Sequence, residues 1–294
     1  MPELPEVETV KNDLKSKITG TKIVSVNALW PGIVKDTPYK VFVKQVEGAE
    51  IIKVKRRAKN LIISLSNGLN LLVHLKMTGH FLIAESSAEI SKEGKWLKAK
   101  NTDLLNDRQN QFIRIIFYLD NGMILAMSDM RKFAYIKLVG DKELQTFLSS
   151  YGPEPFSPEF TEERLKKILR AKNIVVKKVL MDQSKIAGIG NIYADEILWA
   201  ARVHPLSVSY KLSDQDVKAI YQNIKKILKL AIEKRGTSTS DFRDTSGRKG
   251  TFGDLRNVYR RTDLPCPECG GSVKKITVGG RGTHFCPVCQ KEVK

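Results

Sequence analysis

The sequence lacks a long apolar run, because no stretch approaches the ~20 apolar residues that a membrane-spanning helix needs. It also lacks a basic segment followed by an apolar one at its amino end, so no signal peptide is expected. Cysteine is absent from the first 265 residues, which argues against a disulfide framework of the kind found in secreted proteins. Together these absences predict a cytoplasmic protein without a membrane anchor.

Acidic residues are scarce relative to basic ones. The 294 residues include 50 Lys and Arg but only 32 Asp and Glu, which gives a net charge of +18. A hydrophobic content of 41% is ordinary for a folded chain of about two domains. Such a basic protein favours a polyanionic partner, with nucleic acid ahead of an anionic membrane.

All four cysteines lie near the carboxyl end, as two Cys-x2-Cys pairs separated by sixteen residues: Cys266, Cys269, Cys286 and Cys289. This spacing is typical of a four-thiolate zinc ribbon, in which the metal has no open coordination position and is structural. Two disulfides are the alternative, which a reducing compartment disfavours. Between the pairs, Gly279–His284 should form the tip of a hairpin that presents Arg281, a side chain able to bind a phosphate bidentately.

The amino end combines prolines and carboxylates directly before a helical pattern. Apolar residues at spacings of three and four predict a helix that buries one face: Val7, Val10, Leu14 and Ile18. Glu6 and Glu8 then lie in its first turn, where carboxylates complement the helix dipole. On this pattern alone a capped surface helix is sufficient. If Met1 is removed, however, Pro2 becomes a free secondary amine beside Glu3, and such an amine is a nucleophile.

Two β-hairpins are predicted in the next part of the chain. Alternating apolar residues flank Asn67-Gly68 and Asn121-Gly122, and Asn-Gly between such runs is the strongest short-range hairpin signal. Each hairpin runs into an irregular loop, and the two loops could bring Met77, Arg131 and Phe133 to one edge of a β-sandwich. Core packing of Met77 and Phe133 is the alternative.

The remaining chain is read as connections and helices. Residues 85–111 are polar, and we expect a long loop or a short helix around Trp96 and Leu97. Prolines in 152–158 indicate a linker. Helices are predicted at 160–170, 175–181, 193–201 and 213–234, the last with a capping box from Ser213 to Asp216. Residues 236–257 should form a loop that acts as a lid.

A set of motifs in chain order resembles bacterial formamidopyrimidine-DNA glycosylase over nearly the whole chain. They are Pro2–Glu8, Arg56–Lys59, His74–Met77, Asp129–Phe133, Gly188–Ala194 and the paired cysteines.

The resemblance implies an α+β multidomain protein: an N-terminal β-sandwich with a leading helix (1–150), a helix-two-turn-helix domain with a lesion-capping loop (151–258) and a zinc ribbon (259–294). It implies a bifunctional glycosylase and abasic-site lyase that removes oxidised purines such as 8-oxoguanine and formamidopyrimidines. The expected partner is double-stranded DNA with an oxidised base or abasic site, the expected cofactor one structural zinc ion, and the expected state a monomer.

The resemblance also assigns roles to residues. Pro2 would be the Schiff-base nucleophile, Glu3 the acid and base at the sugar, Lys59 a proton-transfer and phosphate residue, and Arg281 the arginine that assists β,δ-elimination. A second group would bind DNA: His74, Met77, Arg131, Phe133, Lys172, Lys177 and Asn191. Among these, Met77, Arg131 and Phe133 would fill the space that an extruded base leaves.

The sequence departs from the family pattern in several places. Thr78 stands where some members have glutamate, Arg260 follows Tyr259 where glycine is usual, and 85–111 is long and lacks a pair of histidines. Two alternatives remain. One is the sister endonuclease for oxidised pyrimidines, which Leu4 disfavours because that group usually has glycine there. The other is a non-enzymatic zinc-ribbon protein that binds DNA.

Overall fold

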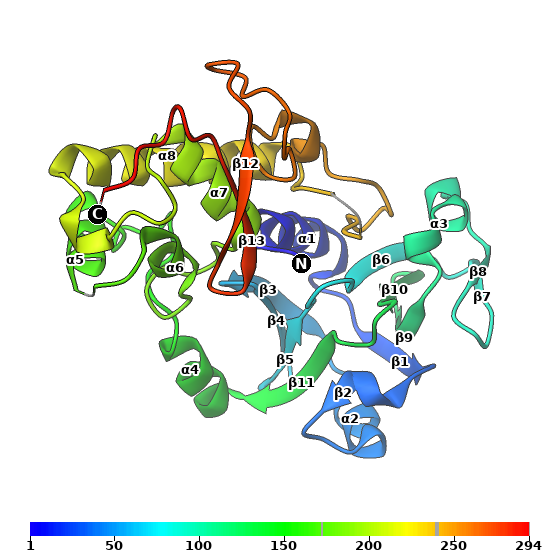
Figure 1. The fold of residues 1–294 in the computed structure, drawn as a ribbon. Helices are drawn as coiled ribbons and strands as arrows, with labels where there is room; N and C mark the ends of the chain where they lie inside the picture. Colours follow the sequence, from blue (N-terminus) through cyan, green and yellow to red (C-terminus); the bar gives the residue numbers. More distant parts are fainter. Residues whose placement is uncertain (172, 239–240, 294) are drawn as a thin grey trace. The chain divides into compact units, whose positions relative to one another are not determined.

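The computed structural model describes residues 1–171, 173–238 and 241–293 (Figure 1). The chain forms two compact units, the first made of Met1–Ser149 with Lys234–Gly253 and the second of Ser150–Glu233 with Asp254–Lys294. The boundaries 1–150, 151–258 and 259–294 stay a prediction. One part of that expectation needs correction, because Lys234–Gly253 packs with the first unit and not with the helical one.

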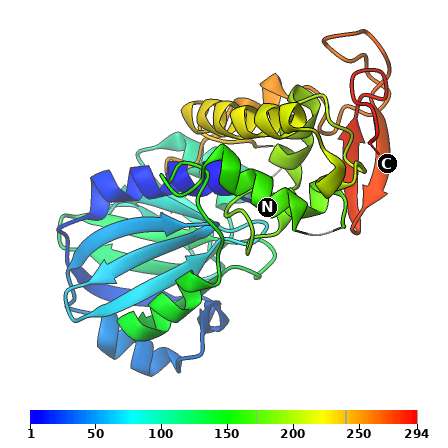
Figure 2. The same ribbon diagram turned by 90° about the vertical axis from the view of Figure 1, so that its left-hand side faces the viewer.

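The first unit is a β-sandwich with helices around it (Figure 2). Its strands are β1 (Ile23–Ala28), β2 (Val34–Lys35), β3 (Ile51–Arg57), β4 (Asn60–Leu65), β5 (Leu69–His74), β6 (His80–Glu85), β7 (Glu89–Ile90), β8 (Trp96–Lys98), β9 (Ile113–Leu119), β10 (Met123–Ser128) and β11 (Tyr135–Gly140). Its helices are α1 (Leu4–Ile18), α2 (Tyr39–Val46), α3 (Thr102–Asn106) and α4 (Asp141–Ser149), with short 3-10 turns η1 (Pro31–Ile33), η2 (Arg108–Asn110) and η4 (Phe252–Leu255), the last of which runs across the boundary between the units.

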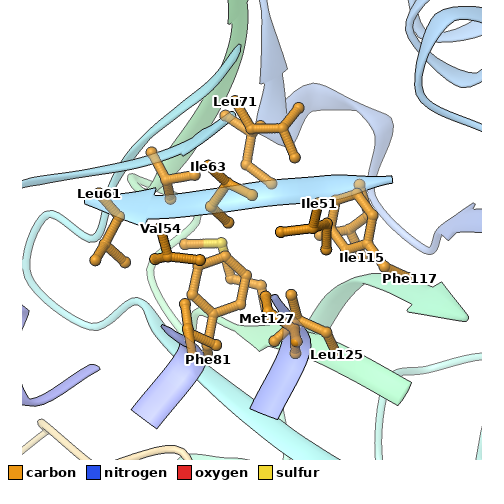
Figure 3. Packing of buried hydrophobic residues seen from close by; sticks show 14 of the residues in the cluster. Ile51, Val54, Leu61, Ile63, Leu71, Phe81, Ile115, Phe117, Leu125 and Met127 are labelled. Atoms are coloured by element: carbon orange, nitrogen blue, oxygen red, sulfur yellow. The ribbon is translucent and has the colours of Figure 1, made fainter. Parts of the chain in front are cut away.

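Two sheets face each other, with strand orders β1-β9-β10-β6 and β2-β11-β5-β4-β3. Both hairpins expected from Asn-Gly are confirmed, since β4 pairs antiparallel with β5 and β9 with β10. Gly68 and Gly122 have φ of 79° and 75°, a conformation that glycine adopts without steric cost. Alternate strand residues point inward and fill the space between the sheets, as Figure 3 shows for Val54, Phe81, Phe117 and others. Burial of this face gives the unit its hydrophobic stabilisation.

Helix α1 follows the sequence prediction closely. Val7, Val10, Leu14 and Ile18 are fully buried in the sandwich core, and the helix packs on β3 and β4. The amino end of the chain is therefore held by a rigid element.

Residues 85–111 differ from expectation. Trp96 and Leu97 lie in strand β8 instead of a helix, and the helical turn α3 comes later. The segment has its own apolar cluster with Trp96 and Leu104 buried against the outer face of β6, β9 and β10. It is therefore an ordered part of the first unit.

The second unit contains helices and a carboxyl-terminal hairpin. Its elements are α5 (Glu162–Arg170), α6 (Val176–Met181), α7 (Asn191–Ala200), η3 (Ser209–Lys211), α8 (Asp214–Glu233), β12 (Lys274–Val278) and β13 (Arg281–Phe285). The capping box before α8 is confirmed, because Ser213 Oγ accepts from Asp216 N at 3.1 Å and Asp216 Oδ2 accepts from Ser213 N at 2.9 Å. Among the helices in the described ranges, none has the length and apolar character for crossing a membrane.

Candidate active site and nucleic-acid interface

The amino end of the first unit places Pro2 and Glu3 at the opening of α1. Both residues are buried, Glu3 to 2% exposure, while Met1 is 45% exposed. Glu3 is the N-cap residue, and its N–H donates to Glu6 Oε2 at 2.7 Å. The backbone N–H of Glu3 has no partner within the helix, and the Glu6 carboxylate that accepts from it also fixes the backbone of Glu3. Loss of Met1 would leave an amine at Pro2 on this rigid base.

Lys59 lies in the two-residue turn between β3 and β4 and is almost fully buried. Ala58 before it has φ of 52°, an unusual conformation for a residue with a side chain. Arg56 stabilises the turn, because its guanidinium donates to Ala58 O at 2.8 Å and to Glu8 Oε2 at 2.7 Å. The turn with Lys59 is therefore tied directly to α1.

His74 ends β5 opposite Asn60 and is held as a neutral ring. Burial, followed by the charges of Lys76 and Lys59, lowers its pKa to about 4. The backbone N–H of Lys76 donates to His74 Nδ1 at 2.9 Å, so the ring proton belongs on Nε2. At neutral pH the His74 ring is therefore uncharged and can donate one hydrogen bond from Nε2.

Met77, Arg131 and Phe133 come together, as the two loops suggested. Arg131 Nη1 lies 3.0 Å from Met77 Sδ, and its guanidinium stacks over the Phe133 ring at 4.7 Å. Met77 and Phe133 are 39% and 51% exposed, so the core alternative is wrong for both. An exposed apolar pair around a guanidinium is suited to insertion between bases.

Asp129 organises both loops, a role that the sequence motif Asp129–Phe133 did not assign to it. Its buried carboxylate accepts from Ala134 N at 2.8 Å and from Arg131 N at 3.2 Å. Thr78 Oγ1 also donates to it, while accepting from Arg131 N at 3.1 Å. A threonine at 78 therefore joins the loop after β5 to the loop after β10, a role visible only when the loops are adjacent.

The loop that begins at Gly236 is anchored firmly to the first unit. Thr237 N donates to Glu6 Oε1 at 2.6 Å, and a Cβ on Gly236 would lie 2.7 Å from that carboxylate. Phe242 joins the sandwich core, and Arg243 is 4% exposed. Residues 242–247 therefore pack within the first unit instead of forming part of the lid expected for 236–257, of which 239–240 lie outside the described residues.

The second unit presents Arg281 on its hairpin. Gly279 and Gly280 form the turn with φ of 57° and 74°, and Arg281 begins β13 as an exposed residue. This matches the hairpin tip that the glycines predict.

Lys177 does not fit a direct phosphate contact. Its side chain is 0% exposed, and its ammonium lies 2.5 Å from Asp195 Oδ1 and 2.7 Å from Thr283 Oγ1. A buried ammonium needs such partners to offset its desolvation. Lys177 therefore joins α6 to α7 and β13. The next residue, Lys178, is exposed and shares a depression of about 250 Å³ with Arg281.

The other two residues assigned to DNA binding in this unit differ from each other. Asn191 opens α7, and its side-chain amide donates to Gly282 O at 2.9 Å, which ties it to the Arg281 hairpin. Lys172 lies outside the described residues.

The four cysteines converge to a site that fits zinc. Their Sγ atoms all lie within 4.8 Å of one another, with Cys266 and Cys289 at 3.9 Å and Cys269 and Cys286 at 3.4 Å. Four thiolates at ~2.3 Å from one tetrahedral zinc are ~3.8 Å apart. The donor set therefore matches one structural zinc ion with no open position.

Glu196 connects α7 to the start of the ribbon. Its buried carboxylate accepts from the backbone N–H groups of Asn257, Val258 and Tyr259 at 2.8, 3.0 and 2.8 Å. Burial raises the pKa of Glu196, and these donors oppose that rise. The three bonds to Glu196 fix the backbone of residues 257–259, where the chain enters the ribbon.

Arg260 follows that anchor in a left-handed conformation, with φ of 57°. A side chain there costs about 1–2 kcal/mol, whereas glycine adopts the conformation freely. We expect Arg260→Gly to stabilise the second unit by about 0.5–1 kcal/mol despite the added chain entropy. Thermal unfolding should show a rise of about 1–3 °C. Arg260→Ala keeps the strained backbone and should give no rise, so equal stabilisation by both variants would contradict this explanation.

Family models cover most of the chain. The formamidopyrimidine-DNA glycosylase N-terminal domain matches residues 1–136, and the formamidopyrimidine-DNA glycosylase H2TH domain matches residues 151–243. A zinc finger found in FPG and IleRS matches residues 263–291, which contain the four cysteines.

Full-length relatives agree with these matches. The formamidopyrimidine-DNA glycosylase of Pelotomaculum thermopropionicum is 39% identical, with 99% of each chain covered. The structure is similar to that of the Lactococcus lactis Fpg in complex with DNA that contains an abasic site, at a TM-score of 0.85 and 32% identity over 99% of this chain and 100% of that one. The same Lactococcus lactis protein in complex with FAPY-dG DNA gives a TM-score of 0.84 at 32% identity, with the same coverage.

Proposed function

Because the chain belongs to the formamidopyrimidine-DNA glycosylase family of DNA repair enzymes, we propose that it excises oxidised purines from DNA through a Schiff base on Pro2 and then cleaves the strand by β,δ-elimination. The substrates proposed are 8-oxoguanine and formamidopyrimidines, with abasic sites as substrates for the second step. The observation that carries the proposal is the buried Pro2-Glu3 pair on the rigid opening of α1.

The first step uses the nitrogen of Pro2 after removal of Met1. The amine attacks C1′ of the damaged nucleotide, the bond from C1′ to the base breaks, and the base leaves with the electron pair. An α-amine has a reference pKa of ~7.7–8.0, so part of the population is unprotonated at neutral pH. Glu3 is the residue proposed to exchange protons at the sugar, because it is buried directly beside the amine.

The second step uses an iminium. The nitrogen, now bonded to C1′, loses its proton, and its electron pair breaks the C1′–O4′ bond, so the sugar ring opens and an iminium forms at C1′. O4′ takes up a proton, for which Glu3 is the proposed donor. The positive charge of the iminium acidifies the 2′ carbon, and loss of that proton expels the 3′ phosphate. A further proton loss then expels the 5′ phosphate. Lys59, beside α1, and Arg281, exposed on its hairpin, are the cations proposed to assist at these phosphates. Lys178 is added to this group in place of Lys177, because Lys178 is exposed at the depression that it lines with Arg281, whereas the Lys177 ammonium is buried against Asp195.

Duplex DNA with a base extruded from the stack must have the resulting gap filled. The cluster of Met77, Arg131 and Phe133 is proposed for this task, since an exposed thioether, guanidinium and ring lie in contact. His74 would donate from Nε2 to the DNA backbone. The loop from Gly236 onwards would contact the extruded base, because its first residues are bonded to Glu6 next to Glu3.

The test is chemical trapping. Borohydride added during reaction with an 8-oxoguanine duplex should reduce the iminium and leave a covalent adduct. Its mass should correspond to one protein chain bound to one DNA strand. Digestion and mass spectrometry should place the adduct on Pro2. Absence of an adduct with both 8-oxoguanine and abasic duplexes, using protein shown to lack Met1, would exclude the Schiff-base reaction.

The sister activity on oxidised pyrimidines remains the second candidate within the class. The same trapping experiment with a dihydrothymine or thymine glycol duplex discriminates the two, because faster adduct formation there would favour pyrimidine lesions. A cytoplasmic, monomeric protein is proposed alongside this function.

A further inference from the structure

The segment of residues 101–110 and the loop of residues 242–249 are joined by polar contacts within the first unit. Asn101 Nδ2 donates to Ser246 O at 2.8 Å, and Asn110 Nδ2 donates to Gly247 O at 3.2 Å. These bonds connect backbone carbonyls of the loop to side chains from a part of the sequence more than 130 residues away. The proposed function assigns no role to these contacts between residues 101–110 and 242–249.

The central contact is an ion pair between Asp107 and Arg243. Arg243 Nε donates to Asp107 Oδ2 at 2.6 Å, and Nη2 donates to Asp107 Oδ1 at 3.2 Å. The guanidinium is nearly buried, and its Nη1 also donates to Phe242 O at 2.8 Å. A bidentate pair of this type fixes orientation as well as distance. Burial would raise the pKa of Asp107, but the bond to Arg243 lowers it, so the carboxylate stays ionised over the working pH range.

Steric fit restricts the loop at the same place. Gly247 has φ of 81°, and a Cβ there would lie 2.5 Å from Asn110 Nδ2. Asn110 is itself fully buried and is held by His80, whose Nε2 lies 3.1 Å from Asn110 Oδ1. The loop backbone therefore has one position against residues 101–110.

The other end of the loop is bonded next to the proposed catalytic residues. Thr237 N and Glu3 N donate to the two carboxylate oxygens of Glu6, at 2.6 and 2.7 Å. The bond to Glu6 and the ion pair with Asp107 therefore restrain two points of the chain, Thr237 and Arg243, that are six residues apart in the sequence.

We propose that Asp107 is a positioning residue for base excision: through Arg243 it holds residues 242–249, which follow the Thr237 contact to Glu6 in the sequence, in the position that excision of a damaged base requires. The inference rests on the proposed glycosylase function. It predicts a split between the two reactions, because base excision needs the base to be positioned, whereas elimination at a preformed abasic site has no base to position.

The test compares Asp107→Asn with Asp103→Asn as a matched control. Asp103 lies in the same segment and pairs with Arg248 of the same loop at 2.8 Å, but both side chains are largely exposed. Exposed pairs of this kind contribute little. Single-turnover rates are measured on an 8-oxoguanine duplex and on an abasic duplex, together with the melting temperature of each protein.

Asp107→Asn should slow excision of 8-oxoguanine by roughly tenfold or more, since misplacement of a positioning group by ~1 Å is that costly. Its rate on the abasic duplex should stay within about twofold of wild type, and Asp103→Asn should match wild type in both. Arg243→Leu should likewise slow excision of 8-oxoguanine without slowing cleavage of the abasic duplex. The double variant with Asp107→Asn should excise 8-oxoguanine no more slowly than either single variant.

Equal losses on both substrates, or no loss on either, would overturn the positioning role. Failure of the wild-type protein to act on either duplex would instead contradict the proposed function, so the two failures are distinguishable.

Discussion

Protein that retains Met1 should excise 8-oxoguanine at least roughly 10⁴-fold more slowly than protein that begins at Pro2, which is the scale of loss on removing a covalent nucleophile. The reason is that the Pro2 nitrogen is an amide in one form and a free amine in the other. While Met1 is attached, the nitrogen of Pro2 is an amide without a free electron pair or a proton to lose, so it cannot attack C1′. Removal of Met1 converts it to a secondary amine.

The structure indicates that this processing is accessible. Met1 is 45% exposed, whereas Pro2 and Glu3 are buried on α1. Removing the exposed residue leaves the capping bond from Glu3 N to Glu6 in place. The helix should therefore not depend on Met1, and the two forms should have equal melting temperatures.

The experiment uses one preparation in two states. Protein with Met1 retained is produced while methionine aminopeptidase is inhibited, and half of it is then treated with the purified aminopeptidase. Intact mass reports the conversion, and excision and borohydride trapping are measured on both halves. Treatment should restore both activities, and affinity for undamaged duplex should change by only a fewfold. Equal excision by both forms would rule out Pro2 as the nucleophile.

Removal of the zinc should weaken binding to an abasic duplex by roughly 100-fold and abolish strand cleavage. The ribbon has a small core: the cluster at the metal site contains Val273 and the ligands Cys266 and Cys286, with Val258 just before the ribbon, and the hairpin adds the buried Val278 and Phe285. With so little apolar surface, the metal supplies most of the folding free energy of the segment. Arg281 lies on the hairpin of this ribbon, so its position depends on the metal.

Thiol chemistry offers a direct measurement. The chain has four cysteines, and all four are in the cluster, so a thiol reagent should detect none in the native protein and four after chelation, with one zinc released. Trp199 should report the same event by fluorescence, because its Nε1 lies 3.4 Å from Cys266 Sγ.

The sandwich provides the control for that experiment. Its core contains no cysteine, so the first unit should keep its melting transition when the metal is removed. Release of zinc with unchanged DNA affinity would contradict the role given to the ribbon. Rapid thiol reaction in the untreated protein would contradict the metal site itself.

Sequence alone identified the features that depend on local pattern. Asn-Gly between alternating apolar residues determined both hairpins, because turn chemistry and side-chain alternation act over only a few residues. The apolar spacing of Val7 to Ile18 determined α1 in the same way. Cysteine spacing determined the zinc site, since ligand type and separation are written in the chain itself.

The tertiary structure decided every feature that requires a partner distant in sequence. Lys177 and Lys178 are chemically identical neighbours, yet one is buried against Asp195 and the other is exposed, because only the orientation of α6 distinguishes them. Thr78 and Asp129 acquire their role from the adjacency of two loops, and Thr237 and Arg243 are held by Glu6 and Asp107. The first eight residues thus specify the proposed nucleophile Pro2 and the helix that holds it. The groups proposed to contact DNA are decided by folding, since burial and long-range pairing determine which charged side chains are exposed.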